Sequence, residues 1–211
     1  MQHLTLLCIL LITFSSHAQD ERYYRQILTG DLPKFTQKMG EVFEHQFNVQ
    51  GASYQIDLNG DGVEEIIQPQ KRDGVDWIEI RSMSQTKIFE GKLPAIGSSS
   101  SLYKIKLAYL SPSVKVLVLF LDEGYSLGLK FESVARIFLL SFENNDLNSL
   151  KLTMGPHHFH EKEGQRNQYW RRDYFVEIRD VNNDNVRDIV VQYNHIQRIM
   201  IYKGVGEWSR Y

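Results

Sequence analysis

The sequence has little cysteine, few prolines and no marked excess of charge of either sign. One cysteine and five prolines occur among 211 residues, and 24 Lys and Arg residues stand against 26 Asp and Glu residues. A single cysteine excludes a disulfide framework within the chain. The formal net charge of −2 excludes a broadly basic nucleic-acid-binding protein and a disordered tail of one charge sign. We therefore expect an ordinary folded domain that does not bind nucleic acid.

Long hydrophobic runs are also absent. The longest one beyond the amino terminus, Val114 to Leu121, is interrupted by Lys115. A membrane-spanning helix needs roughly 20 consecutive apolar residues, so we expect no transmembrane segment. The run is rich in β-branched and aliphatic residues, which predicts a central strand buried on both faces.

The amino terminus has the pattern of an export signal. Leu4 to Phe14 is apolar apart from two threonines, and its length of about 11 residues is typical of a signal-peptide core. The small residues Ser16 and Ala18 follow, as a signal peptidase requires. We predict that residues 1–18 are removed by cleavage after Ala18 and that the protein is periplasmic or secreted; the alternative is a buried N-terminal strand. Cys8 lies in this segment, so the mature chain would contain no cysteine.

Residues 19–50 are predicted to form an N-terminal helical segment. Asp31 is a suitable N-cap, and Pro33 suits the first turn of a helix. Apolar side chains then recur at helical spacing at Phe35, Met39, Val42, Phe43 and Phe47. We expect this face to pack against the main domain.

The remainder, residues 51–211, is predicted to be mainly β. Ile105, Leu107 and Tyr109 alternate with lysines, as on a half-buried strand. Other short apolar segments are separated by turns rich in Asn, Asp, Gly and Pro, which favours an all-β body.

An internal repeat organises this β region. The order strand, turn, strand, loop, strand occurs in three units, at about 51–93, 101–153 and 168–211. Such repeats predict propeller-like antiparallel units. Three units are fewer than the four to eight blades that close a propeller. The units would therefore form an open or compact variant, or a second copy of the chain would complete a ring as a homo-oligomer.

The first and last units contain acidic turns of one pattern. Numbered from the first aspartate, each turn has side-chain oxygens at positions 1, 3, 5 and 9, and the main-chain carbonyl of position 7 adds another oxygen. The predicted ligands are Asp57, Asn59, Asp61, Val63 and Glu65 in the first turn and Asp180, Asn182, Asp184, Val186 and Asp188 in the last. Ca²⁺ takes six to eight oxygen ligands, and a tight loop with oxygens at alternate positions can wrap one ion. Position 6, Gly62 or Asn185, tolerates the left-handed conformation of a sharp turn.

Two features distinguish these turns from an EF-hand. The twelfth position, which should be a bidentate glutamate, is Gln68 in one turn and Val191 in the other, and the flanking residues have the pattern of strands. The turns instead resemble the calcium-binding hairpin loops of FG-GAP/VCBS repeats, found in integrin α-chain propellers and many exported bacterial proteins. The resemblance covers residues 54–81 and 175–204. The second turn departs from the pattern by having Asn185 in place of glycine.

This resemblance implies two structural calcium ions, each clamping a hairpin, in a non-catalytic binding or interaction module. The ligand of such a module would be a protein or a glycan. Few ligands and an exported location imply weak calcium affinity, with a dissociation constant on the order of 10⁻⁴ to 10⁻³ M. The alternative is that Asp, Asn and Gly form turns without metal. Three carboxylates in so short a turn would, however, repel one another in the absence of a cation.

A competing hypothesis is a secreted, esterase-like serine hydrolase. Residues 124–128 fit the G-x-S-x-G pattern, in which Ser126 would be the nucleophile. Asp173 or Asp180, followed by His195, would preserve the order Ser, acid, His. Against this interpretation, the rest of the chain lacks the alternation of strands and helices that an α/β-hydrolase fold needs.

Two further groups of residues suggest binding. His157, His158 and His160 could bind Zn²⁺ or Cu²⁺, although adjacent histidines point in different directions and a solvated loop is the alternative. Residues 169–172 and 208–211 combine aromatic with cationic side chains. That combination suits stacking on a sugar or a partner protein, or packing of strand ends against the core.

Overall fold

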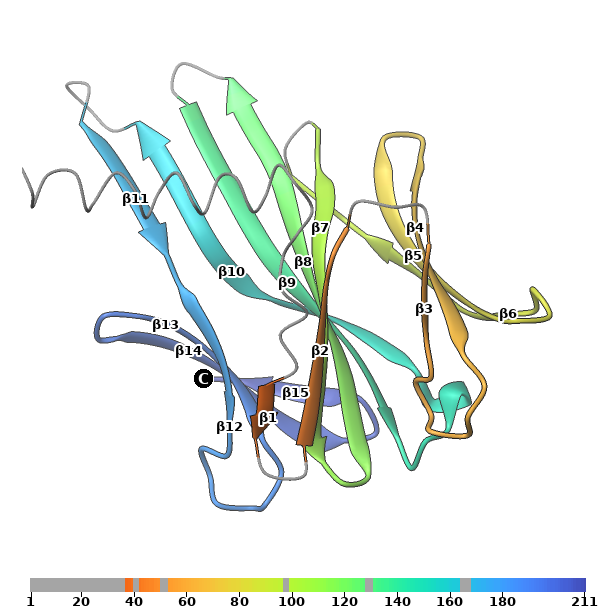
Figure 1. Cartoon of the computed structure of the whole chain (residues 1–211). Helices are drawn as coiled ribbons and strands as arrows, with labels where there is room; N and C mark the ends of the chain where they lie inside the picture. Colours follow the sequence, from red (N-terminus) through yellow and green to blue (C-terminus); the bar gives the residue numbers. More distant parts are fainter. Residues whose placement is uncertain (1–36, 40–41, 50–52, 97–98, 128–130, 164–167) are drawn as a thin grey trace, which may run out of the picture. The chain divides into compact units, whose positions relative to one another are not determined.

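The computed structural model describes residues 37–39, 42–49, 53–96, 99–127, 131–163 and 168–211 (Figure 1). The predicted signal peptide, residues 1–18, lies outside them. Within the described part of the chain the regular elements are strands, apart from one short 3₁₀ helix, η1 (Leu147–Ser149). All paired strands are antiparallel. The prediction of a mainly β, antiparallel fold is therefore confirmed.

The largest sheet, called here the central sheet, has the strand order β1-β2-β7-β8-β9-β10-β11. Its strands are β1 (Gln37–Met39), β2 (Val42–Asn48), β7 (Ser101–Ser111), β8 (Val114–Leu127), β9 (Phe131–Glu143), β10 (Lys151–Glu163) and β11 (Tyr169–Asp173). From β7 to β11 the strands are neighbours in chain order. The long strands fan apart in Figure 1, as expected of a twisted sheet.

Two four-stranded meanders accompany the central sheet. The first meander consists of β3 (Tyr54–Ile56), β4 (Glu65–Arg72), β5 (Val75–Ser82) and β6 (Lys87–Leu93). The second meander consists of β12 (Phe175–Arg179), β13 (Asp188–Tyr193), β14 (Ile196–Gly204) and β15 (Glu207–Arg210). The predicted outer units, 51–93 and 168–211, each contain one meander, whereas the strands of the predicted middle unit belong to the central sheet, as does β11.

Strand β8 lies between two hydrophobic cores. Leu117 belongs to one buried cluster together with Ile67 of the first meander, and Val118 belongs to another together with Ile189 of the second meander. Because successive side chains of a strand point to opposite faces, the two meanders cover opposite faces of the central sheet. The layers therefore form a stack, and the prediction that Val114 to Leu121 is a central strand buried on both faces is confirmed.

The predicted N-terminal helix is wrong for the residues that the structure describes. Residues 37–39 and 42–48 are strands, and β2 pairs with β7 through positions such as Phe47 and Ile105. Phe43 and Phe47 are four residues apart, a spacing that places them on one face of a helix and equally on one face of a strand. Pairing along β7 supplies main-chain partners that local spacing does not reveal. The earlier part of the predicted helix, residues 19–36, lies outside the described residues.

We expect substitutions of one buried and one exposed phenylalanine to test this packing. Phe138 of β9 is 1% exposed in the core beneath the first meander, whereas Phe175 of β12 is 67% exposed. Phe138→Ala should lower the free energy of unfolding by about 3–5 kcal/mol because it leaves a cavity in a packed core. Phe175→Ala should change it by less than about 0.5 kcal/mol. Urea denaturation measures both, and equal losses in the two variants would contradict the layered core.

Candidate metal centre

The two acidic turns occupy equivalent places in the two meanders. The first connects β3 to β4, and the second connects β12 to β13, so each joins the first and second strands of its meander. Position 9 is the first residue of the second strand in both cases: Glu65 pairs with Ile56, and Asp188 pairs with Arg179. We call these turns the first loop, residues 57–65, and the second loop, residues 180–188.

The aspartate at position 1 organises each loop. Asp57 accepts hydrogen bonds from the main-chain N–H of Gly60 at 2.6 Å and of Gly62 at 2.9 Å, one on each carboxylate oxygen. Asp180 accepts the equivalent bonds from Asn183 at 2.7 Å and Asn185 at 2.9 Å. A single carboxylate therefore fixes the tip of each loop from within.

Positions 3 and 5 repeat the same interaction along each loop. Asn59 Oδ1 accepts the N–H of Asp61 at 3.0 Å, and Asp61 Oδ1 accepts the N–H of Val63 at 2.7 Å. In the second loop, the N–H of Asp184 donates to Asn182 Oδ1 at 3.1 Å, and the N–H of Val186 donates to Asp184 Oδ1 at 2.8 Å. The amide of position 3 donates to the remaining oxygen of position 5 in both loops, at 2.9 and 2.7 Å.

Position 9 places a buried carboxylate at the base of each loop. Glu65 is 4% exposed and accepts the N–H of Leu58 at 2.9 Å. Asp188 is fully buried and accepts the N–H groups of Val181 and Tyr202, each at 3.1 Å. Burial raises the pKa of both carboxyls, and the charges at positions 1 and 5 of the same loop raise it further. Each loop thus has a buried carboxylate at its base, a half-buried one at position 1 and an exposed one at position 5.

The main chain turns through the left-handed region twice in each loop. The angle φ is +83° at Gly60 and +85° at Gly62, and it is +62° at Asn183 and +66° at Asn185. The left-handed conformation predicted for position 6 is confirmed. Position 4 was missed, although glycine or asparagine at that position in both loops was the available signal.

The two loops differ in their nearest cation. Lys115 of β8 is buried and donates from Nζ to the main-chain oxygen of Leu58 at 2.7 Å. Burial lowers the pKa of Lys115, and the charges of Asp57 and Glu65 oppose that change. No hydrogen bond from a described Lys or Arg side chain reaches the second loop. The first loop therefore accepts a hydrogen bond from a buried ammonium group of the central sheet, and no described Lys or Arg side chain makes the equivalent bond to the second loop, whose own cationic residue is Arg187.

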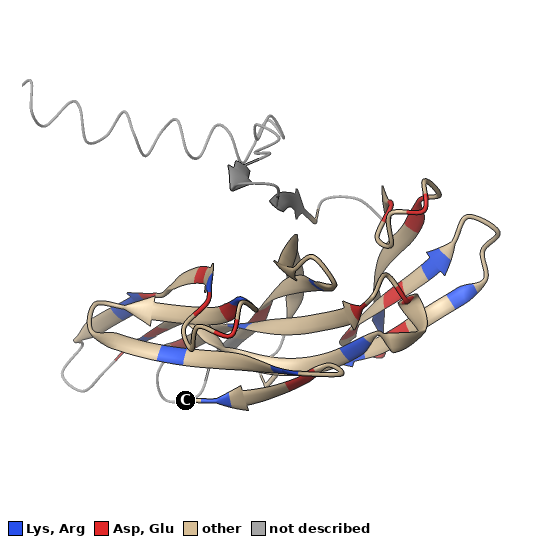
Figure 2. Cartoon of the chain, turned by 90° about the horizontal axis from the view of Figure 1, so that it is seen from below, with Lys and Arg blue, Asp and Glu red and all other residues tan. Residues whose placement is uncertain are grey.

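None of the seven loop carboxylates forms an ion pair with a Lys, Arg or His in the described ranges; Figure 2 colours the charged residues. Within the same ranges, no three His, Cys, Asp or Glu side chains converge into a metal cluster. The donors that the loops offer are carboxylate, amide and carbonyl oxygens, which suit Ca²⁺. Neither loop contains the His or Cys that would favour Zn²⁺.

The structure does not bring the three predicted histidines together. His157 lies beside Arg136, His158 Nε2 lies 2.6 Å from the hydroxyl of Tyr103, and His160 Nε2 lies 2.6 Å from Glu132. Each ring has a different partner, so the histidine segment of β10 does not form a shared metal site.

Ser126 lies within strand β8, opposite Glu132 of β9. A nucleophile elbow requires a sharp turn between a strand and a helix. The residues after Ser126 lead instead into the antiparallel partner β9, so the local setting of an elbow is missing from the described residues.

The two aromatic and cationic segments pack within the sheets. Trp170 of β11 contacts His160 edge-on, with ring centroids 4.6 Å apart, and Arg172 lies over its ring at 5.1 Å. Trp208 of β15 packs edge-on against Tyr202, with centroids 5.0 Å apart. These contacts account for the two tryptophans as strand packing, whereas Tyr169 and Tyr211 are 59% and 70% exposed.

Comparisons of the chain with protein-family models, with curated proteins and with solved structures find no match. In the part of the chain that the structure describes, no helix has the length and apolar character needed to span a bilayer.

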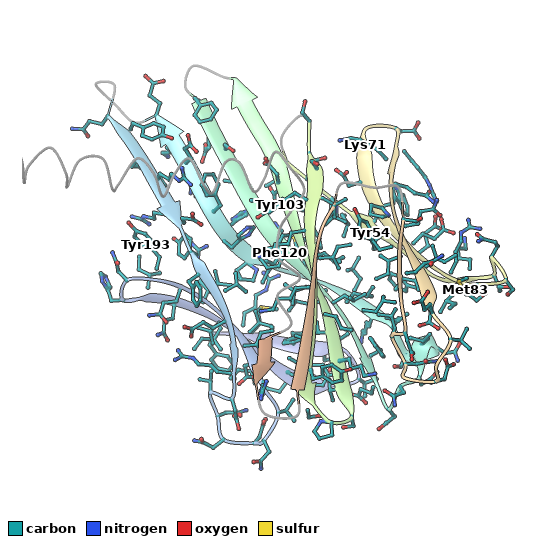
Figure 3. All side chains as sticks on the ribbon, viewed as in Figure 1. Tyr54, Lys71, Met83, Tyr103, Phe120 and Tyr193 are labelled. Atoms are coloured by element: carbon teal, nitrogen blue, oxygen red, sulfur yellow. The ribbon has the colours of Figure 1, made fainter. Side chains whose placement is uncertain are left out.

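His158 is expected to make stability depend on pH. Its ring is buried edge-on against Phe120, with centroids 5.2 Å apart, and Figure 3 labels Phe120 and Tyr103 on adjacent strands. Burial lowers the pKa of His158 from 6.5 to about 4, with smaller contributions from Lys104 and His157. The unfolded chain therefore binds a proton that the folded chain does not. Stability should be complete above pH 6.5 and should fall by about 3 kcal/mol as the pH falls from 6.5 to 4.

Urea unfolding of wild type and His158→Gln across this pH range measures that contribution. In His158→Gln the free energy of unfolding should depend less steeply on pH than in wild type. In His160→Gln, where the altered residue lies beside Glu132, it should depend on pH as in wild type. If stability in His158→Gln depended on pH as steeply as in wild type, His158 would not be the source of the pH dependence.

The left-handed loop positions are expected to tolerate glycine better than alanine. A Cβ added at Gly62 would contact nothing within 4 Å, so Gly62→Ala tests backbone strain alone. Gly62→Ala and Asn185→Ala should each lower the free energy of unfolding by about 1 kcal/mol. Asn185→Gly should not lower it. Thermal melts measure the differences, and an Asn185→Ala variant as stable as Asn185→Gly would contradict the strain argument.

Proposed function

We propose that this chain is an exported protein in which Ca²⁺ stabilises the two acidic loops, and that it acts as a non-catalytic binding module. The observation that supports the proposal most strongly is the repetition of one hydrogen-bond pattern in two separate loops. The first loop holds four carboxylates and the second holds three, and none of them forms an ion pair with a described cationic side chain. Like charges held so close together favour binding of a cation.

The oxygens that already accept N–H groups can also face an ion. An ionised carboxylate has about four acceptor sites, and the main-chain amides occupy one site on each oxygen of Asp57 and Asp180. The proposed ligands are the side chains at positions 1, 3, 5 and 9 and the carbonyls of Val63 and Val186. A bound Ca²⁺ would supply two positive charges to each loop. The amide bonds would orient the carboxylates before an ion arrives.

The two loops are expected to depend on calcium to different degrees. The ammonium of Lys115 lies beside the first loop and supplies part of the positive charge there. No described Lys or Arg side chain donates a hydrogen bond to the second loop, although Arg187 is one of its own residues. We therefore propose that calcium stabilises the second meander more than the first.

The role as a binding module rests on the same features. Each meander carries its acidic loop between its first and second strands, which supports a relationship between the two as propeller-like repeat units of the FG-GAP/VCBS kind. Export through residues 1–18 would deliver the chain to the periplasm or the exterior. The proposed ligand is a protein or a glycan, and a second copy of the chain would be a further partner.

Calcium is expected to raise the melting temperature, and EGTA to lower it. At a calcium concentration 100 times the dissociation constant, each occupied loop adds about 2.7 kcal/mol to the free energy of unfolding. For a chain of this size, each kcal/mol corresponds to about 2–4 °C. Thermal melts in Ca²⁺, Mg²⁺ and EGTA measure the shift. The absence of any shift between Ca²⁺ and EGTA in wild type would overturn the proposal.

Substitutions at position 5 test whether the calcium-dependent shift in melting temperature arises from the two loops. Asp61→Asn and Asp184→Asn each remove one charge and keep an oxygen for the main-chain amide. Each variant should lose part of the calcium shift, and Asp184→Asn should lose more. Asp73→Asn, an exposed carboxylate in the β4–β5 turn with φ of +51°, is the matched control and should keep the full shift.

A further inference from the structure

A cavity of about 290 Å³ lies where β9 and β10 of the central sheet meet β14 and the end of β15. Its lining includes the guanidinium groups of Arg136, Arg198 and Arg210, together with His157 and the apolar side chain of Met200. No residue of the two acidic loops lines it. The cavity is therefore separate from the candidate calcium loops.

An irregular segment of β10 shapes this cavity. The register of β10 against β9 shifts between Met154 and His157 and again between His157 and Phe159. Gly155 has no room for a side chain, because an added Cβ would lie 2.6 Å from Ile137 Cγ1 and 2.9 Å from its main-chain oxygen. A bulge of this kind releases main-chain groups from the strand ladder. The carbonyls of the segment must then find other partners.

Three arginines from three strands converge on those carbonyls. Arg136 of β9 donates from Nη1 to the oxygen of Gly155 at 3.1 Å, and Arg198 of β14 donates from Nη1 to the oxygen of His157 at 2.9 Å. Arg210 of β15 donates from Nη2 to the oxygen of Met154. The three guanidinium groups are thus gathered around one short segment.

Only one of the three charges is compensated. Arg136 forms an ion pair with Glu123, whose side chain is fully buried. Neither Arg198 nor Arg210 forms an ion pair with any carboxylate of the described residues. Arg198 also donates from Nη2 to the hydroxyl of Tyr174 at 3.3 Å. A guanidinium has five N–H donors, so both arginines retain donors after these bonds. Two positive charges therefore border a cavity without an ion-pair partner among the described residues; the main-chain oxygen of Tyr211, a residue that also lines the cavity, accepts the N–H of Ile199 at 2.8 Å.

The geometry points to a binding site for a small organic anion. Its carboxylate or phosphate group would face Arg198 and Arg210, since planar guanidinium groups match both anions with paired hydrogen bonds. Its apolar part would lie against Pro156 and Met200, which line the same cavity. The volume is close to the lower end of ligand pockets, which suits a molecule with one small ring.

The test uses the full chain and three probes that share a benzene ring: benzoate, phenyl phosphate and the neutral benzyl alcohol. Binding is measured by calorimetry and by NMR shift perturbation at low ionic strength, because salt screens charge interactions. At least one of the two anions should bind, and benzyl alcohol should not. The tighter of the two anions identifies the ligand as carboxylate or phosphate. Absence of binding by both anions would overturn the proposal.

Arginine variants distinguish anion binding in the cavity from nonspecific attraction of anions to any exposed arginine. Arg210 is exposed, so Arg210→Gln should fold, and it should weaken anion binding about tenfold through loss of a charged hydrogen bond. Arg210→Lys should weaken it less. Arg179→Gln, an exposed arginine outside the cavity, should leave binding unchanged. Equal weakening by Arg179→Gln, or none by Arg210→Gln, would mean that the arginines only tie the strands together. Anion binding should persist in EGTA, so this result does not depend on calcium.

Discussion

The fold depends on the burial of the adjacent strands β8 and β9 on both of their faces. In β8, alternate side chains enter the core beneath the first meander and the core beneath the second. Each meander is a four-stranded sheet with one apolar face, and neither could bury that face alone. The run from Val114 to Leu121 therefore links the two cores, and alternate side chains of β9 do the same. Because a shift of one residue would exchange its two faces, the register of β8 is closely specified.

Both acidic loops contact the same end of the β7–β8 hairpin. In the first loop, the carbonyl of Leu58 accepts a hydrogen bond from the ammonium of Lys115. In the second loop, the main-chain N–H of Arg187 donates to the carbonyl of Leu110 at 2.8 Å. Leu58 is fully buried in the first core, whereas Val181 at the same position of the second loop is exposed. The first loop is therefore joined more firmly to the central sheet. This difference gives a structural reason for unequal dependence on a bound cation.

The features that could be predicted from the sequence were those determined by the types of residues at neighbouring positions. Oxygen-bearing residues at alternate positions define the loops, and the left-handed residue at position 6 follows from residue type. The double burial of β8 follows from an uninterrupted β-branched run. The strand β2 was not predictable in this way, because its phenylalanine spacing fits a helix and a strand equally and its pairing with β7 is long-range. Lys115 beside the first loop also depends on tertiary contact and has no local signal.

The formal charge of −2 conceals two opposite concentrations of charge. The folded chain holds seven carboxylates in two turns and three guanidinium groups around the bulge of β10. The carboxylates are neighbours in sequence, so their accumulation is visible before folding. The arginines come from three strands and meet only because the second meander packs on the central sheet beside an irregular strand. A binding site that arises from such packing cannot be found from motif spacing, whereas a loop of alternating oxygens can. The two kinds of charge concentration therefore differ in origin, and for each we propose a ligand of the opposite charge.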